Sequence, residues 1–277
     1  MHLARTDPRA AEGPWPAVAP WVEAMKPVLI EIGSLSFTSY GLSKALAALV
    51  AWWMIARELG RRGLDPSPAV ALTLAGALGG FAGAKLYYLA ENVGSLTVSD
   101  LGGTGFTWYG GLIGGTAAVI IVSRRVRLSL GLVAGVIAAP LAIAYGIGQI
   151  GCLLAGDGTY GIASDVPWAI SFPDGTVPTL ERVHPTNAYE ALSAFLVGAL
   201  LLRLRGRISD GALFGLFAVL MGLSRFLVEF VRRHDDVAFG LTQPQLWSVL
   251  LVAVGTVVGL VRIGARRDVA APHARTR

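Results

Sequence analysis

The sequence predicts an all-α protein that crosses a membrane with seven transmembrane helices. Of its 277 residues, 54% are hydrophobic and 15% are charged, whereas a soluble domain has about 25% charged residues. The mean hydropathy is +0.60. A soluble fold of this size cannot bury so much apolar surface, which excludes a soluble enzyme, a disordered protein and a repeat solenoid. An outer-membrane barrel is disfavoured as well, because its apolar signal alternates and is weak in each segment.

Seven apolar runs are the expected transmembrane helices, because a spanning helix needs about 20 largely apolar residues. The first and third runs are short and are expected to extend into their flanks. The fourth contains Pro140, which predicts a kink or an end in the membrane interface. In chain order the runs are Tyr40–Ile55, Ala69–Ala90, Trp108–Val122, Leu128–Leu154, His184–Leu202, Gly211–Phe230 and Leu241–Ile263.

Basic loops alternate along the chain with loops that are acidic or nearly free of Lys and Arg. The loop Glu91–Thr107 contains no Lys or Arg, and the loop Ala155–Val183 contains only Arg182 among several acidic residues. By the positive-inside rule, the N-terminus is outside and the C-terminus is cytoplasmic, which requires an odd number of spans. The basic residues that set this orientation are Arg57, Arg61, Arg62, Arg124, Arg125, Arg127, Arg203, Arg205, Arg207, Arg262, Arg266 and Arg267.

The chain is expected to have three parts. Residues 1–27 form an N-terminal extension, flexible or interfacial, because Pro and charges interrupt it and it lacks the apolar region of a signal peptide. Residues 28–265 form the seven-helix membrane domain. Residues 266–277 form a basic cytoplasmic tail.

Nearly all polar residues in or beside the spans are expected at one depth, near the outer leaflet. Ionisable groups inside a membrane are costly and point to function. Their convergence predicts one polar cavity that opens outward and acts on a lipid or another amphiphile. The residues at this depth include Tyr40, Lys85, Tyr109, Gln149, Cys152, His184, Asn187, Tyr189, Glu190, Arg225 and Glu229.

Arg225 and Glu229 lie four residues apart and therefore share one helix face. They are either a structural ion pair or an arginine that holds a phosphate beside a glutamate that orients it, because the planar guanidinium matches phosphate oxygens. Arg232 and Arg233 are expected as interface anchors that can attract anionic head groups. Lys85 either snorkels to the surface or completes a phosphate site.

The roles of Cys152 and His184 each have two interpretations. Cys152 is either a small buried apolar residue or, with His184, half of a nucleophile and base pair. With one Cys, the chain has no internal disulfide, and one Cys with four His leaves little for a metal site. No metal or cofactor is expected. The net charge of +5 lies in the loops, which argues against nucleic-acid binding.

Several runs, in order and spacing, resemble the bacterial prolipoprotein diacylglyceryl transferases. The resemblance extends from about Ile30 to the seventh span. It implies a seven-span inner-membrane enzyme that transfers the diacylglyceryl unit of phosphatidylglycerol to the thiol of the lipobox cysteine of a prolipoprotein, with glycerol phosphate leaving. The runs are Tyr40-Gly-Leu, Tyr109-Gly-Gly-Leu-Ile-Gly, Gly148-Gln-Ile-Gly-Cys-Leu-Leu-Ala-Gly-Asp, His184-Pro-Thr-Asn-Ala-Tyr-Glu, Gly222-Leu-Ser-Arg-Phe-Leu-Val-Glu-Phe and Leu241-Thr-Gln-Pro-Gln-Leu.

The resemblance assigns site residues and marks the chain as a divergent member. The implied catalytic residues are His184, Arg225, Glu229, Tyr109 and Tyr40, and the implied substrate-binding residues are Gln149, Cys152, Gly161, Asn187, Tyr189, Glu190 and Lys85. Tyr109, Gln149 and Cys152 stand where the best-known members have His, Arg and Asn, and Ala155 and Asp157 also vary. Tyr109 is a poor base at neutral pH, since tyrosine has a reference pKa near 10. We therefore expect His184 to act as the base.

Two other functions stay open on the sequence alone. A paralogue could transfer a lipid or acyl group to another acceptor, through Cys152. A non-enzymatic lipid-binding or transport protein could use the same scaffold, although the chain lacks the internal repeat typical of transporters.

Overall fold

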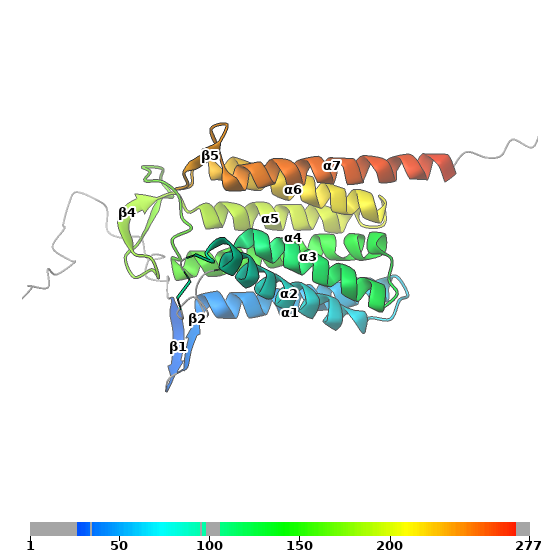
Figure 1. The fold of residues 1–277 in the computed structure, drawn as a ribbon, viewed down its shortest axis with the longest axis horizontal. Helices are drawn as coiled ribbons and strands as arrows, with labels where there is room; N and C mark the ends of the chain where they lie inside the picture. Colours follow the sequence, from blue (N-terminus) through cyan, green and yellow to red (C-terminus); the bar gives the residue numbers. More distant parts are fainter. Residues whose placement is uncertain (1–26, 34, 95, 98–105, 270–277) are drawn as a thin grey trace, which may run out of the picture.

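The computed structural model describes residues 27–33, 35–94, 96–97 and 106–269, and this part of the chain is mostly helical (Figure 1). The predicted N-terminal extension and the end of the predicted tail lie outside the described residues. The helices are α1 (Ser39–Arg61), α2 (Pro68–Glu91), α3 (Trp108–Arg125), α4 (Leu130–Ala155), α5 (Thr186–Leu204), α6 (Asp210–Glu229) and α7 (Gln243–Val269).

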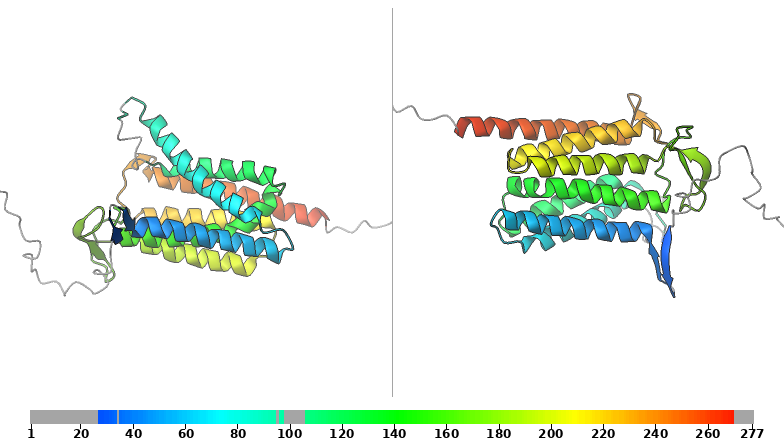
Figure 2. Two further views of the ribbon diagram at one scale, coloured as in Figure 1. Left: turned by 90° about the horizontal axis from the view of Figure 1, so that it is seen from below. Right: turned by 180° about the vertical axis from the view of Figure 1, so that it is seen from behind.

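The helices run side by side, and α2 crosses the bundle at an angle (Figure 2). Six of the described helices are long and apolar enough to span a membrane, namely α1, α2, α4, α5, α6 and α7. Large apolar side chains such as Leu78, Leu86, Leu192 and Leu196 are more than 60% exposed on the helices. Such exposure fits contact with lipid rather than water. The mostly helical, polytopic class expected from the sequence is therefore confirmed.

Polar side chains cap several of the helices where the apolar runs begin. Thr38, Ser129 and Ser209 accept hydrogen bonds from backbone N–H groups in the first turns of α1, α4 and α6. Gly156 ends α4 in a left-handed conformation with φ of 54°. Of the kink or helix end expected at Pro140, the end does not occur, because α4 continues through this residue to Ala155.

Small residues let α2 and α3 approach closely. A Cβ atom added to Gly110 would lie 2.3 Å from the carbonyl oxygen of Gly83, and one added to Gly114 would lie 2.4 Å from that of Gly79. Backbones this close exclude any larger side chain at these positions, as in other small-residue helix contacts in membranes.

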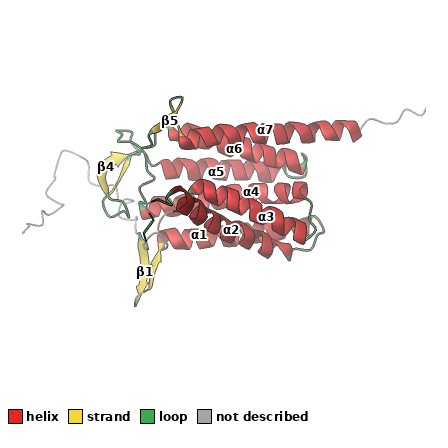
Figure 3. Cartoon of the chain, viewed as in Figure 1, coloured by secondary structure: helices red, strands yellow, loops and turns green. Residues whose placement is uncertain are grey.

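Three antiparallel hairpins are the main departure from an all-α fold (Figure 3). They lie at one end of the bundle, where α1, α5 and α7 begin. Each is short and embedded in a loop, and the apolar-run analysis does not predict them. Their strands are β1 (Val28–Ile32), β2 (Leu35–Thr38), β3 (Ile170–Phe172), β4 (Thr179–Val183), β5 (Asp236–Ala238) and β6 (Leu241–Thr242).

The hairpin β3–β4 has a core of its own that holds the α4–α5 loop against the bundle. Tyr160, Ile170, Phe172 and Val183 are buried together, with Leu153 of α4 packed on them. The Tyr160 and Phe172 rings stack at 5.0 Å. This core fixes the loop directly beside the first turns of α5.

Candidate active site

Buried charges gather at the hairpin end of the bundle, where α5 begins and α6 ends. Glu190, one turn into α5, accepts hydrogen bonds from Arg225 Nη1 at 2.8 Å and from Arg232 Nη2 at 2.9 Å. The Tyr145 hydroxyl of α4 donates a third, at 2.9 Å. The Glu190 side chain is only 2% exposed. Three donors around a carboxylate this deeply buried offset the cost of removing it from water.

Glu229 is the second carboxylate of this cluster, and its side chain is fully buried. Its Oε2 lies 2.8 Å from Arg225 Nη2, an ion pair that lacks hydrogen-bond geometry. Its Oε1 accepts from Thr242 Oγ1 at 3.0 Å and contacts His234 Nδ1. Arg225 therefore bridges Glu190 and Glu229, and the two carboxylates balance the charges of two arginines.

Arg232 is the clearest correction to the sequence analysis. It was expected at the membrane interface, but its side chain is 5% exposed and pairs with Glu190. Its Nε is 4.0 Å from Glu229 Oε2 and has no hydrogen-bond partner. Arg233 does lie near the surface, where it pairs with Glu181 at 2.8 Å. The sequence pattern treats Arg232 and Arg233 alike, because it does not show that the chain turns back toward the bundle just after α6.

A set of neutral polar groups from α4, the α4–α5 loop and the first turn of α5 meets at Asn187. Asn187 Nδ2 donates to Gln149 Oε1 at 2.9 Å and to Thr159 Oγ1 at 2.7 Å. Asp157 in turn accepts from Thr159. The structure thus joins two of the expected substrate-binding residues, Gln149 and Asn187, through the loop that follows α4.

His184 and Tyr189 are paired, and Gly161 packs on them. His184 Nδ1 lies 3.1 Å from the Tyr189 hydroxyl, which accepts from Trp168 Nε1 at 2.6 Å. Gly161 N donates to the His184 carbonyl at 2.8 Å. A Cβ atom at Gly161 would lie 2.2 Å from the Val231 carbonyl oxygen, so only glycine lets this loop meet the end of α6.

The remaining expected residues lie on the first four helices, α1 to α4. Cys152 is buried, with its Sγ 3.9 Å from Lys44 Nζ, and that ammonium lies 4.7 Å from the centre of the half-exposed Tyr40 ring. Tyr109 is buried and stacks on Trp247 of α7 at 4.9 Å. Lys85 lies over the Phe106 ring at 4.9 Å.

The sequence analysis missed four members of the cluster: Tyr145, Arg232, His234 and Thr242. Tyr145 lies within an apolar run, 45 residues before its partner Glu190. His234 and Thr242 lie in the short segment between α6 and α7. That segment's excess of polar residues is the only signal that could have pointed to them.

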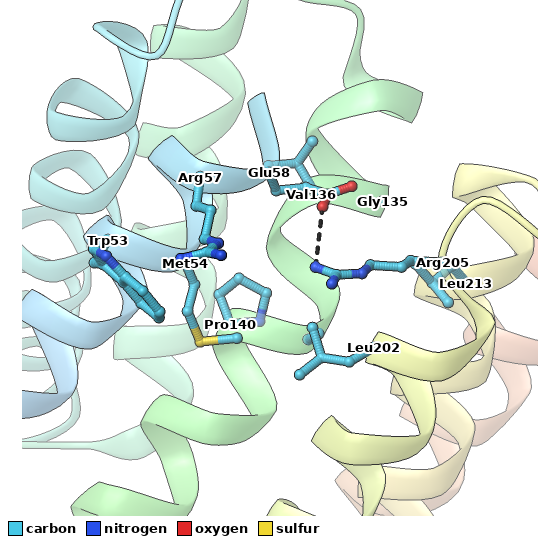
Figure 4. Close-up of a pocket in the computed structure, with 11 residues that line it drawn as sticks. Trp53, Met54, Arg57, Glu58, Gly135, Val136, Pro140, Leu202, Arg205 and Leu213 are labelled. Atoms are coloured by element: carbon cyan, nitrogen blue, oxygen red, sulfur yellow. Dashed lines mark hydrogen bonds and ion pairs between the residues drawn. The ribbon is translucent and has the colours of Figure 1, made fainter. Parts of the chain in front are cut away.

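The opposite end of the bundle holds charges of another kind. Glu58 pairs there with Arg61 at 2.7 Å, Arg62 at 2.8 Å and Arg205 at 3.3 Å. A cavity of about 160 Å³ lies next to this cluster, and Figure 4 shows Arg205 reaching across it to Glu58. These arginines belong to the basic loops, and the lining includes no residue of the candidate active site.

The fold and the cluster define a polytopic membrane protein with a charge-balanced polar site at one end of its helices. The family model described as prolipoprotein diacylglyceryl transferase matches residues 27–261. The chain belongs to this family.

Named relatives cover most of the chain. A phosphatidylglycerol–prolipoprotein diacylglyceryl transferase of Rhodospirillum rubrum is 34% identical over 259 residues, which cover 86% of this chain and 92% of the relative. Proteins of the same name from Clostridium tetani and Geobacter sulfurreducens are 31% and 35% identical, covering 84% and 76% of this chain and 96% and 83% of those proteins.

The buried ion pairs predict that Glu190 contributes more to stability than Glu181, although each of them pairs with an arginine. We expect Glu190→Ala to destabilise the protein by about 3–5 kcal/mol, because it leaves Arg225 and Arg232 to share Glu229 as their one carboxylate in the cluster. Glu181→Ala removes an exposed pair with Arg233 and is expected to cost less than about 1 kcal/mol. Unfolding in detergent measures both. Equal losses in the two variants would contradict the buried network.

Proposed function

We propose that this protein transfers the diacylglyceryl group of phosphatidylglycerol to the lipobox cysteine thiol of prolipoproteins, at the outer leaflet of the bacterial inner membrane. One observation carries the proposal. In a chain of this family, Arg225 is paired with both Glu190 and Glu229 at one end of the bundle. The name shared by the relatives supports the same activity.

The reaction needs a cation at the phosphate. The acceptor thiolate attacks the glyceryl carbon bonded to the phosphodiester oxygen, so that a carbon–sulfur bond forms and the carbon–oxygen bond breaks. The electron pair of that bond leaves with the oxygen, and glycerol phosphate departs with one negative charge more than the phosphodiester had. Donors that are already oriented toward this developing charge stabilise the transition state.

Arg225 is suited to this role by its geometry. Glu190 and Glu229 engage Nη1 and Nη2, and each of these nitrogens carries a second N–H. The Arg225 side chain is 23% exposed, whereas the Arg232 side chain is only 5% exposed. Arg225 therefore contacts the phosphate in this proposal. Arg232 is more deeply buried and supplies the second positive charge of the cluster. Before the phosphate binds, the two arginines therefore balance the two glutamates.

The neutral groups next to the charges complete the proposed substrate site. Asn187 and Gln149 offer amide groups to the glycerol hydroxyls, and Tyr40, Tyr109 and Lys85 line the approach. Gly161, Tyr189 and Glu190 position the loop and Arg225. Gln149 carries no charge, so Arg225 supplies the cation for the phosphate.

The proposed orientation places the site at the outer leaflet. The hairpins and the buried cluster lie at one end of the bundle, and the basic residues Arg61, Arg62, Arg205 and Arg207 lie at the other (Figure 1). Basic loops favour the cytoplasmic side. With α3 as a seventh span, the N-terminus is outside and the C-terminus is cytoplasmic.

Transfer to Cys152 of the protein itself has little support. Cys152 is buried, with 8% of its surface exposed, and its Sγ lies 3.9 Å from the Lys44 ammonium. Burial raises the cost of the thiolate that such a reaction needs. We assign Cys152 a packing role, and Cys152→Ser is expected to keep transfer activity.

Purified protein, phosphatidylglycerol and a lipobox peptide test the activity directly. We expect mass spectrometry to find a diacylglyceryl adduct on the peptide cysteine. Arg225→Ala should lower the transfer rate by about 100-fold or more, as expected for loss of a donor to transition-state charge. Arg57→Ala, at the opposite end, is the matched control and should act like the unmodified protein. Absence of an adduct from the unmodified protein would contradict the proposal.

Single cysteines test the orientation. In a Cys152→Ser background, Asp236→Cys lies between α6 and α7 and Asp65→Cys between α1 and α2, and both positions are exposed. A membrane-impermeant maleimide should label Asp236→Cys in spheroplasts and Asp65→Cys only after the membrane is opened. The reverse labelling pattern would place the site at the cytoplasmic leaflet.

A further inference from the structure

We propose that His234 is the general base that takes the proton from the acceptor thiol, and that Glu229 positions it. This inference rests on the proposed transferase function. A thiol reacts as its thiolate, and free cysteine has a pKa of about 8.5, so a transferase at neutral pH needs a base beside the thiol.

The partner of His234 sets its tautomer. Nδ1 lies in hydrogen-bond contact with Glu229 Oε1. A carboxylate only accepts hydrogen bonds, so Nδ1 carries the proton, and Nε2 of the neutral ring is then a free acceptor. Glu229 is fully buried and held by Thr242 Oγ1 at 3.0 Å and by Arg225. A fixed carboxylate thus orients an imidazole whose other nitrogen can receive a proton, as in other nucleophile–base–carboxylate arrangements.

The position of His234 also fits the role. Its side chain is 45% exposed, so an acceptor peptide can reach it from outside the bundle. Glu229 connects it directly to Arg225, the proposed phosphate ligand. Glu229 therefore contacts both the proposed base, His234, and the proposed phosphate ligand, Arg225.

His184 lacks this arrangement. Its Nδ1 faces the Tyr189 hydroxyl, which also accepts the Trp168 N–H. A hydroxyl can donate to this nitrogen or accept from it, so it does not fix the tautomer of His184 as a carboxylate does. The structure thus favours His234 over the residue expected from the sequence.

The step is balanced without any further reactant. The thiol proton moves to His234 Nε2, the sulfur electron pair forms the carbon–sulfur bond, and the carbon–oxygen pair leaves with glycerol phosphate. The imidazolium then releases its proton to water and returns to its starting state. Of the charged groups near His234, Glu229 contacts the ring, and Arg225 and Arg232 lie beside Glu229. Arg233, Asp235 and Asp236 are its neighbours in the chain, and Arg233 is paired with Glu181.

The test compares the two described histidines in the phosphatidylglycerol-to-peptide assay. We expect His234→Ala to lower kcat by about 100-fold or more at neutral pH, the usual contribution of a general base. Its KM for phosphatidylglycerol should stay unchanged. Its residual rate should rise with pH as the peptide thiol ionises unaided, and added imidazole should restore part of the rate. His184→Ala is the comparison and should show no imidazole rescue, while Arg57→Ala, at the opposite end of the bundle, is the control that should keep its kcat.

Two results would overturn the assignment. One is a His234→Ala variant with the kcat and pH profile of the unmodified protein. The other is a loss of kcat and an imidazole rescue that follow His184→Ala instead. Glu229→Gln distinguishes positioning from base catalysis, because it should lower kcat without any imidazole rescue. Inactive unmodified protein would refute the transferase proposal itself, which separates the two failures.

Discussion

Arg225 lies between two carboxylates that are almost wholly withdrawn from solvent, and much of the structure follows from keeping these charges paired. A buried charge without a partner costs several kcal/mol, so each of these charges must be paired in the folded protein. Glu190 comes from α5, Arg225 and Glu229 from α6, Arg232 from the turn after α6, and Tyr145 from α4. This one cluster fixes the depth at which three helices meet and the path of the chain that leaves α6.

The cluster also explains why the hairpins lie at this end. The α4–α5 loop must approach the end of α6 closely enough for Gly161 to meet the Val231 carbonyl oxygen, and the β3–β4 core holds it there. The α6–α7 segment returns as β5–β6 and brings Thr242 and His234 to Glu229. In the proposed mechanism, phosphate binding and proton transfer therefore share one carboxylate, that of Glu229. The opposite end, with Glu58 and its arginines, has the charge pattern of a cytoplasmic face.

The helices could be predicted from the sequence because a span must be apolar along its whole length, whatever its neighbours are. The hairpins could not, since β5 and β6 contain three and two residues and leave no periodic pattern. The expected meeting of Glu190, Arg225 and Glu229 depended only on their common depth. The role of Arg232 depended on a chain reversal that no local pattern encodes. The choice between His184 and His234 depended on which side chain each ring contacts in the folded chain, a tyrosine or a carboxylate.

A double-mutant cycle on Glu190 and Arg225 tests the central claim, that these charges act as one unit. The transfer rates of Glu190→Gln, Arg225→Gln and the double variant would be measured against the unmodified protein. Groups that act as a unit give non-additive losses. We therefore expect the double variant to be no slower than the slower single variant. Losses that multiply in the double variant would show that the two residues act independently and would contradict this account.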